Sequence, residues 1–333
     1  MFVSRQPYII AEIGSVHDGS FGNACKLIEV AAAAGADVVK FQTHIAAAET
    51  LADAPMPPYF EGEPRYEYFL RTGFTAEQWM MLGRKCIEQG VRFLSSPFSL
   101  EAVDLLEQVG VDAYKIPSGE VTNVPLLERV ASTRKPVLLS SGMSNWAELD
   151  HAVAILRSGG ELTVMQCSSM YPCLPEMVGL NILAEMGHRY GCAVGFSDHT
   201  LGMSAAIAAV ALGASVIEKH LTFSRLMYGS DAKHSMEPHD FRVFCTEIKA
   251  IGVMLGNPVD KNDLRPYEKM KGIFEKSVVA AMDIPANTIL ERKHLAFKKP
   301  GDGISAAHYR SLMGARVARA ISKDHKFKKE DLL

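Results

Sequence analysis

Several features that would mark a special class of protein are absent from this sequence. The 333 residues include only two tryptophans and six cysteines, and no CxxC pair of the kind used by zinc or redox sites occurs. No stretch reaches the roughly 18 apolar residues that a membrane span needs, and the first 15 residues lack a signal-peptide pattern. We therefore expect a protein of the reducing cytoplasm with no membrane partner.

An excess of charge of either sign is also missing. The 35 basic and 38 acidic side chains leave a net charge of −3, which predicts no nucleic-acid partner. Hydrophobic residues make up 48% and charged residues 22%, values typical of a folded protein with a large core. The length suggests two domains, or one large barrel with an appendage.

Short β-branched runs alternate with longer amphipathic stretches from residue 7 to about 256. The predicted strands are 7–13, 37–43, 91–96, 112–116, 136–141, 162–167, 193–197 and 215–220. The predicted helices are 20–34, 75–89, 99–109, 124–132, 146–157, 177–190, 203–212 and 238–255. Eight such units favour a (β/α)8 TIM barrel over an open sheet, and no GxGxxG follows the first strand to support dinucleotide binding.

The last quarter of the chain changes character. Residues 257–275 are rich in Pro, Asn and alternating charges without strong periodicity, which is typical of a linker. Residues 276–333 contain 12 basic and 6 acidic residues, a net charge of +6 that leaves −9 on residues 1–275. The sequence thus predicts a barrel domain over 1–256, a linker, and a small basic domain over 276–333 that docks on a barrel.

Ionisable residues gather where the predicted strands end, which is where TIM barrels place their active sites. Lys40 and Gln42 are two residues apart, as are Glu218 and His220. Because side chains alternate along a strand, both members of each pair should point to the same side. A buried ion pair with a purely structural role is the alternative interpretation of any one such charge.

The types of these residues indicate what the site binds. Lys40, Lys115 and nearby serines supply the donors that a phosphate or carboxylate needs. His199 and His220 end adjacent strands and could share a divalent metal, although either histidine alone could be a hydrogen-bonded barrel residue. The sequence therefore predicts an anionic substrate and, from the histidine pair, a metal site.

Several motifs at these positions resemble the sialic acid synthase (N-acetylneuraminate synthase) family. They are AEIGSVHDG (11–19), KFQTH (40–44), SSPF (95–98), YKIPSGE (114–120), LLSSGM (138–143), MYP (170–172), GFSDHT (195–200) and IEKH (217–220). The tail motifs KSVVAAMDIPANTIL (276–290) and KPGDGI (299–304) are similar to the antifreeze-like SAF domain of that family. The resemblance covers nearly the whole chain and implies a TIM barrel followed by a small β-rich SAF domain.

The resemblance implies an activity and a cofactor. The reaction would condense phosphoenolpyruvate with N-acetylmannosamine or a related 2-acetamido sugar, release phosphate and form a nine-carbon 2-keto acid. A divalent metal, Mn or Mg, would be held by His199 and His220. The residues implied to bind phosphoenolpyruvate are Lys40, Lys115, Ser118, Ser140 and Ser197.

Further residues receive roles from the resemblance alone. Glu12 matches the acid near the sugar hydroxyls, and Lys115 is expected to take part in catalysis as well as in binding. The positions implied to line the sugar and metal pocket are Gln42, Glu120, Tyr171 and Asp231, with Glu120 and Asp231 expected to be catalytic. From composition alone, Asp231 could equally be a turn residue beside Gly229 and Ser230.

The sequence departs from the family pattern at substrate-binding positions. Val16 and Asp18 stand where the family usually has asparagines. Ser169 stands where an asparagine often contacts phosphoenolpyruvate, and Lys299 stands where an arginine commonly reaches from a partner subunit towards the N-acyl group. Lysine offers a point charge in place of a planar fork of donors, so acyl recognition need not be preserved. The resemblance also implies a homodimer with exchanged C-terminal domains.

Three other functions remain open at this point. A synthase of pseudaminic, legionaminic or another acylamino nonulosonic acid would use the same site with a different sugar. A metal-dependent aldolase, or another barrel synthase that uses phosphoenolpyruvate, could also place lysines at strand ends. A barrel that has lost catalysis and binds sugars is disfavoured, because Glu12, both lysines and both histidines are all present.

Overall fold

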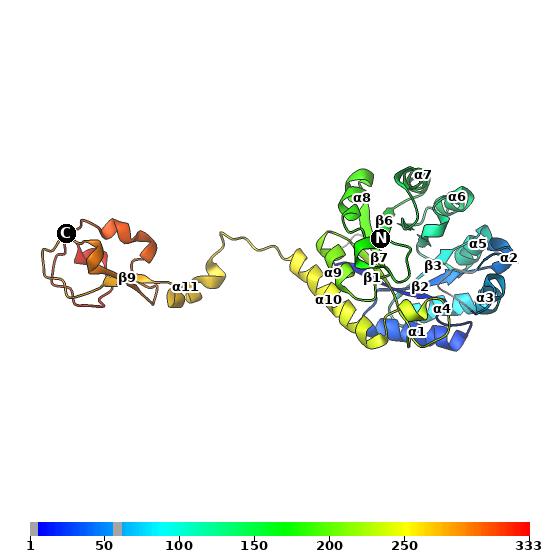
Figure 1. Ribbon diagram of the computed structural model, residues 1–333, viewed down its shortest axis with the longest axis horizontal. Helices are drawn as coiled ribbons and strands as arrows, with labels where there is room; N and C mark the ends of the chain where they lie inside the picture. Colours follow the sequence, from blue (N-terminus) through cyan, green and yellow to red (C-terminus); the bar gives the residue numbers. More distant parts are fainter. Residues whose placement is uncertain (1–5, 56–61) are drawn as a thin grey trace. The chain divides into compact units, whose positions relative to one another are not determined.

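The computed structural model describes residues 6–55 and 62–333 of the chain. Contacts between residues divide the chain after Pro258 into two compact units (Figure 1). Within the described residues, no helix is long and apolar enough to cross a membrane.

Eight parallel strands form a closed barrel in unit 1, and they follow one another in sequence order around it (Figure 1). They are β1 (Tyr8–Gly14), β2 (Val38–Thr43), β3 (Arg92–Pro97), β4 (Tyr114–Ile116), β5 (Val137–Ser140), β6 (Leu162–Cys167), β7 (Ala193–Asp198) and β8 (Val216–His220). The barrel closes where β1 pairs with β8, from Tyr8 opposite Val216 to Glu12 opposite His220. The predicted TIM barrel is therefore confirmed.

A layer of helices surrounds these strands. They are α1 (Phe21–Ala34), α2 (Ala46–Glu49), α3 (Arg65–Thr72), α4 (Ala76–Glu88), α5 (Leu100–Val109), α6 (Val124–Ser132), α7 (Trp146–Arg157), α8 (Ile182–Tyr190), α9 (Ser204–Ala211) and α10 (Pro238–Gly256). The side chains of Ser20, Thr75, Ser99 and Asn145 cap α1, α4, α5 and α7 by accepting a hydrogen bond from a backbone N–H of the first turn. The sequence did not predict α2 and α3, and α8 begins later than predicted.

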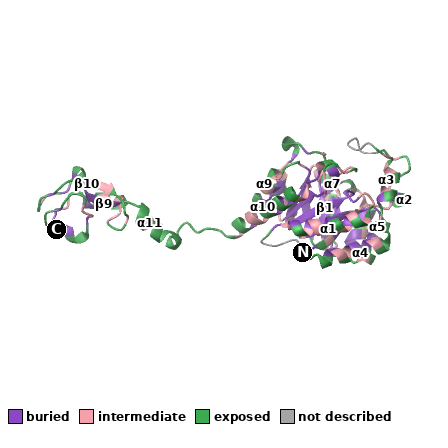
Figure 2. Ribbon diagram, turned by 90° about the horizontal axis from the view of Figure 1, so that it is seen from below, coloured by how far each residue is buried: buried purple, intermediate pink, exposed green. Residues whose placement is uncertain are grey.

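The apolar core of unit 1 has two parts, and the strands of the barrel separate them. The strand β1 is almost wholly buried and is drawn in purple in Figure 2. The larger part lies between the strands and the helices. The smaller part is an apolar plug inside the barrel, made of Ile10, Val38, Leu94, Ala113, Leu138, Met165 and Val216. Because neighbouring side chains on a strand point to opposite faces, strands that supply the plug also contribute to the larger part, whereas β7 has Gly195 opposite Val216 and supplies no plug residue.

Unit 2 has its own small core and little regular structure. It contains α11 (Glu268–Phe274) and an antiparallel pair of strands, β9 (Ser277–Ala280) and β10 (Leu295–Lys298). Its buried apolar residues are Val278, Ala280, Ile284, Leu290, Leu295, Leu312, Val317, Ile321 and Phe327. The small antiparallel sheet confirms the predicted β-rich C-terminal domain, and α11 lies inside the segment predicted as a linker.

Short 3-10 helices lie in both units. They are Ser118–Glu120, Pro175–Met177, Ala232–His234, Arg265–Tyr267, Arg292–His294, Ala306–Leu312 and Lys329–Asp331.

One fully buried ion pair joins β7 to β8 on the outer side of the barrel. Lys219 Nζ donates to Asp198 Oδ2 at 2.8 Å, and the two side chains are 1% and 0% exposed. The same ammonium group donates to the carbonyl oxygens of Thr200 and Gly202, in the loop that follows β7. A charge this deeply buried is tolerated because every proton of the ammonium has an acceptor.

Replacing Lys219 by methionine should lower the free energy of unfolding by about 3–5 kcal/mol, because Asp198 would remain as a buried charge without a partner. The matched control is Lys26→Met: Lys26 is 69% exposed in its pair with Glu29, and such a surface pair contributes about 0–1 kcal/mol. Urea unfolding followed by circular dichroism would measure both. Equal losses in the two variants would contradict a structural role for the buried pair.

Candidate active site

Along the strands, the side chains that point into the barrel change from apolar to polar from one inward position to the next. Two positions after each residue of the apolar plug, and at the matching position of β7, the side chain is polar. These residues are Glu12, Lys40, Ser96, Lys115, Ser140, Cys167, Ser197 and Glu218. Alternation along a strand turns both sets inward, so the polar layer lies directly on the plug, at the C-terminal ends of the strands.

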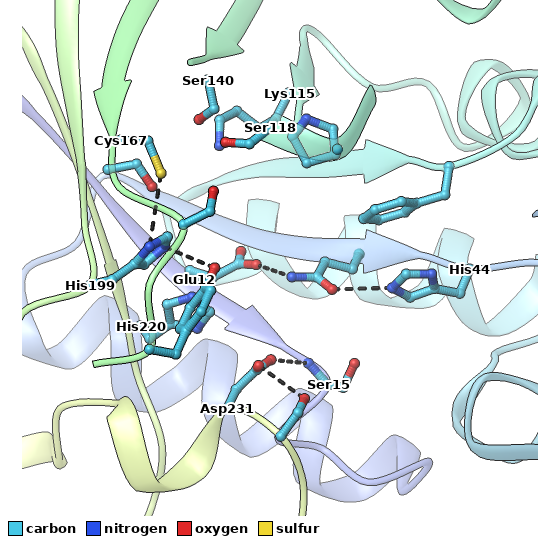
Figure 3. Close-up of a pocket in the computed structure, with 18 of the residues that line it drawn as sticks. Glu12, Ser15, His44, Lys115, Ser118, Ser140, Cys167, His199, His220 and Asp231 are labelled. Carbon is cyan, nitrogen blue, oxygen red and sulfur yellow. Dashed lines mark hydrogen bonds between the residues drawn. The ribbon is translucent and has the colours of Figure 1, made fainter. Parts of the chain in front are cut away.

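A cavity of about 510 Å³ opens above this layer, and Figure 3 shows many of the side chains that line it. The predicted site residues found in its lining are Glu12, Lys40, Gln42, Lys115, Ser118, Ser140, Ser169, Tyr171, Ser197, His199, His220 and Asp231. Lys40 and Gln42 lie in it together, and so do Glu218 and His220, which agrees with the alternation inferred from the sequence. The structure therefore brings the predicted cations, hydroxyls and imidazoles into one space.

Two predicted site residues are not in that lining. Glu120 belongs to the 3-10 helix Ser118–Glu120, and its carboxylate accepts a hydrogen bond from Asn123 Nδ2 at 2.7 Å. Lys299 belongs to unit 2, where its ammonium group lies 4.9 Å from the ring centre of Phe274. Their predicted roles in catalysis and acyl recognition therefore stay predictions.

Four charged groups are paired on the floor of the cavity. Lys115 Nζ lies 3.1 Å from Glu218 Oε2, and Lys40 Nζ lies 3.6 Å from Glu218 Oε1. Lys40 also pairs with Glu12 Oε2 at 2.8 Å. All four side chains are at most 5% exposed. Two ammonium groups and two carboxyl groups thus share one desolvated space.

The two carboxyl groups on the floor have pKa values displaced in opposite directions. Burial raises the pKa of Glu12, and the nearby Glu218 carboxylate adds to this although Lys40 opposes it. Burial would also raise the pKa of Glu218, but Lys115 and Lys40 together outweigh it and lower that pKa to about 2. Carboxyl groups separated in this way can take different roles, with Glu12 able to hold a proton while Glu218 stays ionised.

His199 and His220 stand on adjacent strand ends with ring centres 5.5 Å apart. His199 Nδ1 donates to the carbonyl oxygen of Ser168 at 2.8 Å, and His199 Nε2 lies 3.2 Å from the hydroxyl oxygen of Tyr171. His220 Nδ1 is buried and has no hydrogen-bond partner among the described residues. Burial lowers the pKa of His220 to about 4, so its ring is neutral at physiological pH.

Asp231 reaches the cavity because the backbone at the end of β1 is unusual. The pairing of β1 with β2 is irregular between Glu12 and Gly14, and Gly14 has φ of 52°. The Asp231 carboxylate packs against this glycine, and its Oδ2 accepts a hydrogen bond from the Ser15 backbone N–H at 3.2 Å. Any side chain at position 14 would overlap the carboxylate. Asp231 is therefore more than a turn residue.

Sequence reasoning missed several residues of this site. Glu218 was recognised at a strand end but received no role, although it lies between the two lysines. His44, Arg65 and Cys167 also line the cavity. The alternation along β6 and β8 could have identified Cys167 and Glu218, whereas Arg65 lies on α3, a helix that the sequence did not predict.

Among residues 6–55 and 62–333, no group of three or more His, Cys, Asp or Glu side chains is arranged to hold a metal ion. The protein's own donors for such an ion would be the two imidazoles. A first-row divalent ion accepts neutral imidazole nitrogens and can complete its coordination with oxygen atoms of water or of a ligand. The buried His220 Nδ1, which has no hydrogen-bond partner among the described residues, fits such an ion, and His199 Nε2 could join it in place of its contact with the Tyr171 hydroxyl.

Comparisons with known proteins agree with this architecture. A (β/α)8 barrel that gathers lysines, carboxyl groups and histidines in one cavity at its strand ends has the layout of an enzyme. The chain belongs to the NeuB family, whose sequence profile matches residues 27–260, and a SAF domain profile matches residues 275–333. The family membership expected from the sequence motifs is confirmed.

Individual relatives extend over almost the full chain. An N,N'-diacetyllegionaminic acid synthase of Campylobacter jejuni is 37% identical, with 96% of this chain and 98% of the relative covered. The human N-acetylneuraminate-9-phosphate synthase is 32% identical over 95% of this chain and 90% of its own. The crystal structure of an N-acetylneuraminic acid synthetase from Leptospira borgpetersenii, in complex with citrate, matches with a TM-score of 0.70 at 28% identity, covering 80% of this chain and 90% of that one.

The contact between Gly14 and Asp231 makes a prediction about stability. Gly14→Ala should cost about 1–2 kcal/mol for the left-handed backbone alone, and more because the new methyl group overlaps the carboxylate. In an Asp231→Ala background, the same substitution should cost only the backbone part. Thermal unfolding of the two single variants and the double variant would measure the difference. Identical costs in both backgrounds would show that the carboxylate does not pack on Gly14.

Proposed function

We propose that this chain condenses phosphoenolpyruvate with an acylamino hexose, either N-acetylmannosamine or a related 2-acetamido sugar. Carbon 3 of the enol would form a bond to the aldehyde carbon, water would add at carbon 2, and inorganic phosphate would leave. The product is a nine-carbon 2-keto acid of the sialic acid type. The observation that carries the proposal is the buried pair of lysines, surrounded by serine hydroxyls, on the floor of the cavity.

The lysine end of the cavity suits phosphoenolpyruvate. Lys40 and Lys115 supply two charges to a small anion, and Ser118, Ser140 and Ser197 line the same end. Ser140 Oγ is buried without a hydrogen-bond partner among the described residues, so it has a donor available for a ligand oxygen. Hydrogen bonds from ionised donors to a phosphate or carboxylate are the strongest that side chains make.

The remaining wall of the cavity suits the sugar. Glu12 lies between Lys40 and Gln42, and Asp231 and Tyr171 line the same cavity. A carboxyl group that can hold a proton, as the raised pKa of Glu12 indicates, can transfer it to the oxygen of the aldehyde as the carbon–carbon bond forms. The other polar groups would hold sugar hydroxyls in place. Glu12 is accordingly the residue that we assign to proton transfer.

A divalent cation, Mn or Mg, held by His199 and His220 belongs to this proposal. It would polarise the aldehyde oxygen and stabilise the negative charge that develops there. The charges on the floor give a second reason to expect it. Glu218 offsets one of the two lysine charges even when Glu12 holds a proton, so a buried ligand with two or three negative charges needs another counter-charge.

Two further parts of the proposal follow from family membership. We expect a homodimer with exchanged C-terminal units, in which Lys299 of one copy serves the site of another. We also expect the enzyme in the cytoplasm, where phosphoenolpyruvate is available. Gel filtration with light scattering would test the dimer, and a monomer that turns over at full rate would contradict the exchange.

Phosphate release from phosphoenolpyruvate, measured with a panel of acceptors, tests the reaction. The panel should contain N-acetylmannosamine, its 6-phosphate and 2,4-diacetamido-trideoxyhexoses, so that the pseudaminic and legionaminic alternatives are included. We expect turnover with at least one acceptor and loss of at least about 100-fold with chelator, with His220→Ala or with Lys115→Ala, because each removes a charge or ligand from the reacting atoms.

The control variant is His188→Ala, an exposed residue of α8 that should keep full activity. Undiminished turnover with chelator and in both site variants would contradict the proposed site. Trapping of an adduct by borohydride in the presence of pyruvate would instead identify a Schiff-base aldolase. No phosphate release with any acceptor would favour the sugar-binding protein that has lost catalysis.

A further inference from the structure

His44 lies beside the proposed site in an aromatic stack. It follows β2 directly, and its imidazole ring is stacked between Phe69 of α3 and Phe98 of the loop after β3. The ring centres are 3.8 Å and 4.1 Å away, with interplanar angles of 9° and 21°. The His44 side chain is only 6% exposed. This ring therefore has little freedom to rotate or shift.

Both nitrogens of His44 have polar partners. Nδ1 lies 2.6 Å from Glu49 Oε1, at the end of α2, and Nε2 lies 3.1 Å from Gln42 Oε1. Glu49 is itself held, because its second oxygen accepts a hydrogen bond from the Ile45 backbone N–H at 3.3 Å. Glu49 is 5% exposed, so a proton must lie between its carboxyl group and the ring.

These contacts determine the direction of the hydrogen bonds. A carbonyl oxygen can only accept, so Nε2 of His44 carries the hydrogen that binds Gln42 Oε1. The amide nitrogen of Gln42 must then face the other way, where it donates to Glu12 Oε1 at 2.8 Å. Figure 3 shows His44 and Glu12 at the two ends of this chain of hydrogen bonds.

A reversed amide would require both of its neighbours to change protonation. It would place an NH2 group against Nε2 of His44, which would then have to carry no hydrogen, and an oxygen atom against Glu12, which would then have to donate a proton of its own. The other oxygen of Glu12 is already paired with Lys40 at 2.8 Å. Both oxygens of Glu12 are thus held from fixed directions, one by a lysine and one through Gln42.

We propose that His44, anchored by Glu49, is a positioning residue that holds the amide of Gln42 in the orientation that directs Glu12. The inference rests on the proposed function, since it assigns His44 to the group that would transfer the proton. His44 would not touch the reacting atoms. Its effect on the rate would come from the geometry of Glu12, where a small displacement has a large cost.

The first test replaces His44 by phenylalanine, which keeps an aromatic ring in the stack and removes both polar contacts. We expect kcat for phosphate release to fall by about 10- to 100-fold, the loss that follows when a buried hydrogen bond to a catalytic group is broken. The KM for phosphoenolpyruvate should stay within about threefold, because Lys115 and the serines are unchanged. Steady-state kinetics would separate the two constants.

The matched control for lost packing is Phe93→Leu. Phe93 stacks on Phe41 with ring centres 5.9 Å apart and does not line the cavity. This variant should lower the melting temperature at least as much as His44→Phe while leaving kcat near the wild-type value. If His44 served only packing, His44→Phe would have normal kcat, and that result would overturn the inference.

A double-mutant cycle tests whether His44 acts through Gln42. Gln42→Ala removes the amide that connects the two residues, so adding His44→Phe should cause almost no further loss of kcat. Full additivity of the two losses would contradict the proposed path. Glu49→Gln can still donate to Nδ1 and should retain far more activity than Glu49→Ala, because the anchor of the ring is kept.

These outcomes remain distinct from failure of the proposed reaction. A wild-type protein that releases no phosphate with any acceptor would overturn the proposed function and, with it, this inference. A wild-type protein that is active while His44→Phe is equally active would overturn the role of His44 alone. Circular dichroism of each variant would confirm that losses of kcat occur in folded protein.

Discussion

The Glu218 carboxylate, buried between Lys40 and Lys115, is the interaction on which the rest of the site depends. Without it, two ammonium groups would lie in a desolvated space with only Glu12 to offset them. With it, the lysines are held at fixed positions on the floor of the cavity before any ligand arrives. In the function that we propose, an incoming anion would find these lysines already oriented and would compete with the Glu218 carboxylate for them.

Much of the barrel could be predicted because its signals are local. The helices 124–132 and 146–157 coincide with α6 and α7, since their apolar positions repeat with the helical period. The extra helices α2 and α3 were missed for a physical reason: α2 has only four residues, too few to show a period, and α3 lies in an insertion between β2 and α4. The structure of such short helices is determined by the elements that pack against them more than by a pattern in their own sequence.

The part of the site that could be predicted is the set of residues that the alternation of side chains along a strand places inside the barrel. Lys40, Lys115 and Glu12 lie inside because each follows an apolar inward residue by two positions. The partners of these groups could not be predicted from the sequence. Glu218 pairs with two lysines that lie on strands far from it in the sequence, and only the folded barrel brings them together. The same holds for His44, whose ring is held by residues of α2, α3 and the loop after β3. The roles of Glu218 and His44 therefore become visible only from contacts between elements that are distant in the sequence.

The apolar plug beneath the polar layer has a consequence for the order of events. Seven packed side chains close the barrel below the lysines, so nothing can pass through the bottom. A molecule that reaches Lys115 must therefore arrive from the side of the strands' C-terminal ends, where the cavity lies above the polar layer. In the reaction that we propose, the small anion would therefore enter first and the sugar second, and the long product would have to clear the mouth before the next turnover.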